Sequence, residues 1–206
     1  DHRDLHSFPT RRSSDLATLT HLRNFDLGEQ DSLVIHANGR LEDSIAIHLR
    51  LKESYTDTLS GFRMQMRMGP ADLTILNPVL APLASAELKS GHLDSLTMQV
   101  KGREYLAYGE MHMHYRNLRI RILKKGNPDK KSFLSSVMSG LANAFVVKKN
   151  NDSRKGVVFF RRHRERSALN YLVKITLSGV TSSVGARSNK KQTKRYQQTL
   201  KEKQLP

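Results

Sequence analysis

The chain contains 206 residues, carries a formal net charge of +16 at neutral pH and has neither Cys nor Trp. Without Cys, it can form neither a disulfide framework nor a thiolate zinc site. No uninterrupted apolar run reaches the roughly 18–20 residues that a helix needs to span a bilayer, so this stretch is not itself a transmembrane segment.

Residues 1–16, DHRDLHSFPTRRSSDL, match one reading frame of a widely used short-read sequencing adapter at every position. We therefore expect this segment to be a disordered artefact of sequence assembly, and we exclude it from fold reasoning. The biological chain is then expected to begin at or near Ala17 as a fragment, with any upstream signal peptide or membrane anchor missing rather than absent. What remains is long enough for one domain with a real core.

Charge is distributed unevenly along the rest of the chain. Residues 17–115 hold 9 Lys and Arg against 12 Asp and Glu, a net charge of −3. Residues 116–206 hold 23 against 4, a net charge of +19. This asymmetry predicts a mildly acidic part joined to a basic part that attracts an anionic partner, either a membrane surface or nucleic acid.

Alternation of apolar and polar residues predicts several β-strands in the first half of the chain. Each expected strand places apolar side chains on one face and polar side chains on the other, as in an antiparallel sheet with one face open to water. These strands are residues 17–27 (weak), 31–38, 44–52 and 61–68.

The strongest strand signal is residues 96–123, which we predict to form a long hairpin. Its turn is expected at residues 101–104, KGRE, and Tyr105 opens the apolar alternation of the second strand. At Arg116-Asn117 the alternation slips by one residue, so we expect a bulge or tight bend there. No helix of useful length separates the strands, and sequential strands are therefore expected to be neighbours in a meander.

The C-terminal part is predicted to be helical and basic. Residues 132–147 and 167–184 place apolar side chains at helical spacing, and residues 156–161 between them indicate a short strand. The expected apolar stripe of the second helix is Leu169, Leu172, Val173, Leu177, Val180 and Val184. Residues 187–206 have little apolar content, and we expect a disordered basic tail.

These patterns predict a mainly β (α+β) fold: an antiparallel, curved β-sheet or groove meander followed by two amphipathic C-terminal helices. The sheet is expected over residues 17–123 and the helical basic region over residues 124–186. The helices either pack on the sheet, which we favour because their stripes are narrow, or lie on a membrane.

Two side-chain patterns on the strands are candidates for binding. Six of the seven Met alternate along strands, which fits an ordinary core face and also a greasy groove for acyl chains. The groove candidates are Met64, Met66, Met68, Met98, Met111 and Met113. His112 and His114 share one strand face, but two imidazoles without a third ligand favour solvated histidines, and we predict no metal and no other cofactor.

Clusters of Lys and Arg are candidates for contact with phosphate groups. The candidates for an anionic surface are Arg119, Arg121, Lys124, Lys125, Lys148, Lys149, Arg161, Arg162, Arg164 and Arg166. Nucleic-acid modules usually add stacking aromatics or a recognisable module, which these runs lack. Phospholipid or an anionic membrane surface is therefore the expected partner, with nucleic acid as the alternative. Carboxylates lie scattered near predicted turns, so we predict neither an enzyme nor a small-molecule substrate.

Residues 73–185 resemble the C-terminal part of AsmA-like proteins of Gram-negative bacteria, particularly those of Bacteroidetes. The segments that carry the resemblance are residues 90–96 (SGHLDSL), 107–111 (AYGEM), 115–118 (YRNL), 142–151 (ANAFVVKKNN) and 164–185 (RERSALNYLVKITLSGVTSSVG). These segments are structural signatures and not catalytic ones.

The resemblance implies a large, non-enzymatic envelope protein in the periplasm, anchored in the inner membrane by an N-terminal helix that this fragment lacks. Related proteins build an elongated, curved β-groove and are linked to outer-membrane biogenesis and to intermembrane phospholipid transport. The resemblance brings no active site, so we assign no catalytic residue.

Overall fold

The computed structural model describes residues 16–20, 31–41, 43–57, 61–78, 80, 86–122, 147–186 and 188–202. Of the segment expected to be an assembly artefact, only Leu16 is described, and it begins the first strand. The predicted helix at residues 132–147 lies outside the described residues except for Val147, as do Lys124 and Lys125.

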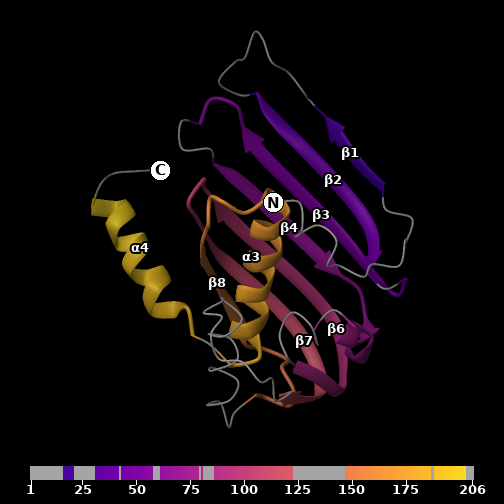
Figure 1. The fold of residues 1–206 in the computed structure, drawn as a ribbon. Helices are drawn as coiled ribbons and strands as arrows, with labels where there is room; N and C mark the ends of the chain where they lie inside the picture. Colours follow the sequence, from indigo (N-terminus) through magenta and orange to yellow (C-terminus); the bar gives the residue numbers. More distant parts are fainter. Residues whose placement is uncertain are drawn as a thin grey trace.

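An antiparallel sheet forms the body of the molecule, as predicted (Figure 1). Its strands follow the order β1-β2-β3-β4-β6-β7-β8, and short β5 pairs with β6 off this path. Sequential strands are therefore neighbours in a meander. The strands are β1 (Leu16–Thr20), β2 (Ser32–Leu41), β3 (Ile45–Ser54), β4 (Phe62–Met68), β5 (Ala71–Asp72), β6 (Ala86–Gly102), β7 (Leu106–Ile122) and β8 (Lys155–Arg161).

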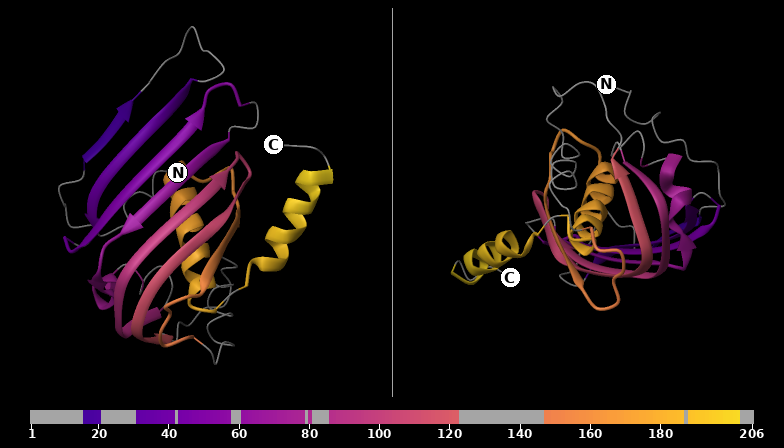
Figure 2. Two further views of the ribbon diagram at one scale, coloured as in Figure 1. Left: turned by 180° about the vertical axis from the view of Figure 1, so that it is seen from behind. Right: turned by 90° about the horizontal axis from the view of Figure 1, so that it is seen from below.

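Two C-terminal helices complete the mainly β fold. Helix α3 (Ala168–Ser183) lies inside the curve of the sheet, and helix α4 (Lys190–Glu202) lies outside it (Figure 2). We call the face that α3 covers the inner face and the opposite face the outer face. No helix in the described residues is long and apolar enough to cross a bilayer.

The predicted alternation places the Met side chains together on the inner face. Register sets Met66 opposite Met98 and Met98 opposite Met111, so three neighbouring strands contribute one row of thioethers. Five of the six candidate Met are buried in the hydrophobic core, and Met68 packs against it. A strand sends alternate side chains to opposite faces, which is why this period can be read from the sequence.

A β-bulge accommodates the phase slip in the long hairpin, as predicted. Asn117 adopts a left-handed backbone with φ of 54°, and the pairing of β6 with β7 skips a residue there. Leu118 consequently returns to the inner face and is buried. The turn differs slightly from prediction: it comprises residues 103–105, and Tyr105 is 47% exposed instead of opening the apolar face of β7.

Helix α3 confirms the predicted helix, but its expected apolar stripe coincides only in part with its buried face. Of the stripe, Val184 is buried and Leu172 and Val180 pack against the core. Ser167 caps the helix, accepting a hydrogen bond from the Asn170 N–H at 3.2 Å. Leu169 is 56% exposed, whereas Ile175 is fully buried. The buried face is otherwise formed by residues that are mostly small: Tyr171, Ser178, Gly179, Thr181, Ser182 and Ser183.

Small residues are needed on this face because α3 sits very close to β7 and β8. A Cβ atom at Gly179 would lie 2.7 Å from the Met111 methyl carbon, and one at Gly156 would overlap the Ser183 hydroxyl oxygen. Larger apolar side chains would force the helix away from the sheet. The stripe residues Leu172 and Val180 are therefore only half-buried against the core.

Side chains of α3 and the segment after it satisfy the backbone of the edge strand β8. The Ser182 hydroxyl accepts from the Val157 N–H at 2.9 Å. The Ser178 hydroxyl accepts from the Phe159 N–H at 3.2 Å and donates to the Phe159 carbonyl at 2.9 Å. Asn189 Nδ2 donates to the Val157 carbonyl at 2.7 Å. An edge strand covered in this way is protected from pairing with another chain.

Helix α4 corrects the prediction of a disordered tail, although residues 203–206 lie outside the described part of the chain. Most of its residues are strong helix formers, and it contains neither Gly nor Pro, so helix propensity offsets its low apolar content. Tyr196 supplies the docking contact, edge-to-face with Tyr108 at 5.3 Å and Phe159 at 6.3 Å between ring centroids.

Buried tyrosines make stability sensitive to alkaline pH. Burial raises the pKa of Tyr115 to about 12 and that of Tyr196 to about 12. Because the unfolded chain loses these protons near pH 10, the two tyrosines should leave the free energy of unfolding unchanged from pH 8 to about pH 10 and lower it between pH 10 and 12. Urea unfolding from pH 8 to 12 measures this, and Tyr115→Phe should reduce the fall. An equally steep fall in the variant would contradict the assignment to Tyr115.

Candidate functional site

The outer face of the sheet carries a row of cations on three adjacent strands. Lys52 of β3 lies opposite Arg63 of β4, and Arg63 lies opposite Lys101 of β6. Tyr108 of β7 continues the row, opposite Lys101. We call Lys52, Arg63 and Lys101 the cation row. Each of the three side chains is exposed.

Acidic residues do not neutralise the cation row. Within the described residues, none of its three members forms an ion pair. Glu110, on the same face of β7, pairs with Lys155 at 3.5 Å and lies 3.9 Å from His112 Nε2. The segment with a net charge of −3 therefore presents concentrated positive charge on one face, which its overall count conceals.

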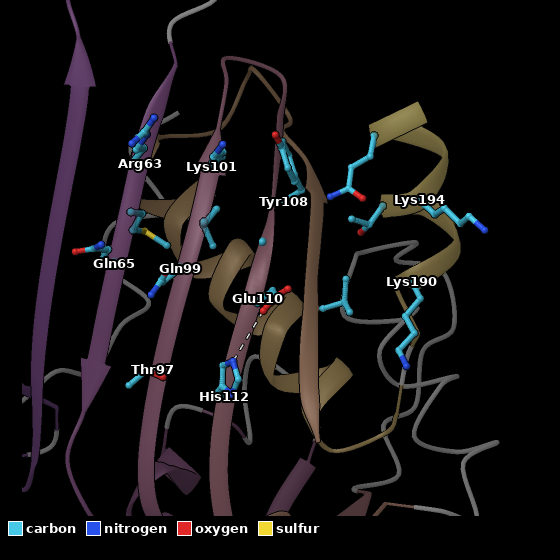
Figure 3. A pocket seen from close by; sticks show the side chains of 16 residues that line it. Arg63, Gln65, Thr97, Gln99, Lys101, Tyr108, Glu110, His112, Lys190 and Lys194 are labelled. Carbon is cyan, nitrogen blue, oxygen red and sulfur yellow. Dashed lines mark ion pairs between the residues drawn. The ribbon is translucent and has the colours of Figure 1, made fainter. Parts of the chain in front are cut away.

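Two adjoining cavities open along the cation row. The larger, of about 720 Å³, lies between the outer face of β4, β6 and β7 and the helix α4 (Figure 3). The smaller, of about 380 Å³, extends toward β2 and β3 and includes Lys52. Both are lined by Arg63, Lys101 and Tyr108. Figure 3 places Arg63 and Lys101 side by side at one end of the larger cavity, while Lys194 of α4 points away from the sheet.

The basic residues that the sequence singled out do not converge on one surface. Arg161 pairs with Leu106 at the start of β7, whereas the Lys149 carbonyl accepts from the Leu118 N–H near its end. Twelve residues of strand separate the two places by roughly 40 Å. Arg161, Arg162, Arg164 and Arg166 thus lie at one end of the sheet, and Arg119, Arg121, Lys148 and Lys149 lie toward the other.

Several of these candidates already have partners. Arg164 pairs with Glu104 at 2.5 Å, and the Arg162 guanidinium lies 5.3 Å from the centroid of the Tyr171 ring. Arg121 pairs with Glu87, and hydrogen bonds from Lys89 and then Arg121 hold the pKa of Glu87 below its usual value. These contacts reduce the positive charge that the predicted clusters offer to a ligand.

The two histidines singled out on β7 both lie on the outer face, half-buried. His112 lines the larger cavity beside Glu110. Within the described residues, no group of three His, Cys, Asp or Glu side chains is placed to hold a metal ion.

The inner face continues beyond the Met core onto β1–β3. Register extends the row from Met64 through Leu51 and Ile35 to Leu19. Leu51 and Ile35 are half-buried, and Leu19 is 52% exposed. Helix α3 packs mainly on β8 and β7, which lie at the opposite edge of the sheet from β1. The exposed part of the apolar face is therefore formed by β1–β3 and not by the Met residues themselves.

Sequence reasoning missed the cation row because its members belong to separate strands and to the segment with negative net charge. Alternation predicted that they face solvent, but their alignment depends on strand register. Comparison of the chain with protein-family models, with curated proteins and with solved structures found no match.

Proposed function

We propose that this chain is a non-enzymatic segment of an AsmA-like envelope protein, whose apolar inner face shelters phospholipid acyl chains. In this proposal the segment lies in the periplasm, takes part in outer-membrane biogenesis or phospholipid transport between membranes, and is anchored to the inner membrane through another segment. The supporting observation is the apolar row that runs from the buried Met core to the exposed Leu19.

Physical chemistry favours an apolar occupant for this part of the face. Ile35, Leu49 and Leu51 are half-buried side by side on β2 and β3, and contiguous exposed apolar area marks a binding surface. Met64 and Met66 continue the same rows into the core. Flexible Met side chains adapt their shape, which suits acyl chains of varied length and saturation.

We expect the purified chain to retain phospholipid in native mass spectrometry and to take up fluorescent phospholipid from vesicles. The double variant Leu49→Gln/Leu51→Gln should bind lipid roughly 30-fold more weakly, because two lost apolar contacts remove on the order of 2 kcal/mol. Arg50→Gln is the matched control, since Arg50 lies between them on the opposite face. A folded wild-type chain that neither retains nor takes up lipid would contradict the proposal.

A basic nucleic-acid-binding module is the second candidate, and the cation row is the observation that favours it. This function predicts micromolar or tighter binding of RNA or DNA that weakens steeply with salt. A gel-shift assay at physiological salt with no binding would remove it.

A further inference from the structure

We propose that the cation row, at the junction of the two outer cavities, binds a small soluble ligand with two or more phosphate groups. This site lies on the face opposite the apolar rows and does not depend on the lipid-binding proposal. Lys52, Arg63 and Lys101 supply the charge, and Tyr108 forms the wall next to them.

The register of the strands alone brings the three positive charges close together, before any ligand binds. Adjacent strands lie about 4.8 Å apart, so the backbone positions of the three cations fall within about 10 Å. Like charges directly opposite each other on neighbouring strands destabilise a sheet. The row therefore costs stability in the free protein, and an anion that bridges its members relieves that cost.

Acidic residues near the row indicate which side the ligand occupies. Asp31 and Asp57 line the smaller cavity, on the side toward β2. Among the described residues that line the larger cavity, Glu110 is the only carboxylate, and it pairs with Lys155. Phosphate groups should therefore lie at Arg63 and Lys101, with the rest of the ligand extending toward α4.

The size of the larger cavity suits a small ligand. Its volume of about 720 Å³ is within the ~300–1,000 Å³ typical of small-molecule sites. Helix α4 borders the cavity on the side of the edge strand β8, outside the curve of the sheet (Figure 2). Lys190 and Lys194 on this helix add positive potential at the cavity wall without having to touch the ligand.

The test is titration calorimetry of the full chain with inorganic tripolyphosphate. We expect saturable binding that weakens as salt is raised, and a loss of at least ten-fold in affinity for Arg63→Gln and for Lys101→Gln. Arg67→Gln is the matched control, because Arg67 lies on the same strand face opposite His48 and Thr97; its affinity should change less than three-fold. Without ligand, Arg63→Gln and Lys101→Gln should melt at the same temperature as wild type or higher.

Parallel titrations separate this ligand class from other anions. Single-stranded RNA and vesicles of anionic phospholipid are the two comparison probes, and inorganic phosphate tests whether one phosphate group suffices. Binding to RNA or to vesicles without binding to tripolyphosphate would overturn the proposal, as would equal losses in Arg67→Gln and Arg63→Gln. The variant Leu49→Gln/Leu51→Gln should keep its affinity for tripolyphosphate. The lipid proposal and the phosphate proposal can therefore fail independently of each other.

Discussion

Replacing Ile175 by Ala is expected to lower the free energy of unfolding by about 2–5 kcal/mol, the range for deleting a fully buried aliphatic side chain. Ile175 has no exposed surface and belongs to the core cluster beneath α3. Urea unfolding followed by circular dichroism measures the change. Helix α3 packs closely against the sheet at Gly179 and Ser182. Neighbouring side chains therefore have little freedom to move into the cavity that the substitution creates.

Leu169→Ala is the matched control in the same helix. Leu169 is 56% exposed, so its truncation should change the free energy of unfolding by less than about 0.5 kcal/mol. The stripe predicted from the sequence implies the reverse order, because it includes Leu169 and omits Ile175. A larger loss for Leu169→Ala than for Ile175→Ala would therefore restore the predicted stripe and contradict the observed packing.

Ser178→Ala is expected to lower the free energy of unfolding by about 1–3 kcal/mol, the cost of leaving a buried polar group without a partner. Its hydroxyl both accepts from the N–H and donates to the carbonyl of Phe159, on the edge strand of the sheet. Urea unfolding followed by circular dichroism measures the loss.

Thr176→Val separates this effect from the mere removal of a hydroxyl from α3. The Thr176 hydroxyl donates to the Leu172 carbonyl within the same helix, at 3.0 Å, and supports no strand. Its loss should change the free energy of unfolding by less than about 0.5 kcal/mol. Equal, small effects in the two variants would mean that the Ser178 hydroxyl does not stabilise β8.

The two faces of one sheet thus carry two different proposals. The inner face continues from a Met core to half-buried Leu and Ile on β2 and β3, which suits acyl chains. The outer face aligns Lys52, Arg63 and Lys101, and Arg63 and Lys101 line the cavity that α4 borders, which suits phosphate groups. Because alternate residues of each strand serve opposite faces, the two proposals can be tested with variants of adjacent residues, such as Leu51 and Lys52.

Local patterns in the sequence determined most of the strands and helix α3. Strict alternation identified β3, β4 and the long hairpin, and the slip at Arg116-Asn117 located the bulge at Asn117. Helical spacing identified α3 to within a residue at each end. These features depend on neighbours within a few positions, through the periods of 2.0 and 3.6 residues.

Tertiary structure alone decided what depends on residues far apart in the chain. The buried face of α3 is set by the unpaired backbone of β8, which selects Ser178 and Ser182 over the Leu residues of the stripe. Helix α4 needs the ring of Tyr108 to dock Tyr196. The cation row exists only because the register aligns residues of three strands. That register is stabilised by contacts between residues far apart in the chain, which a local sequence pattern does not contain.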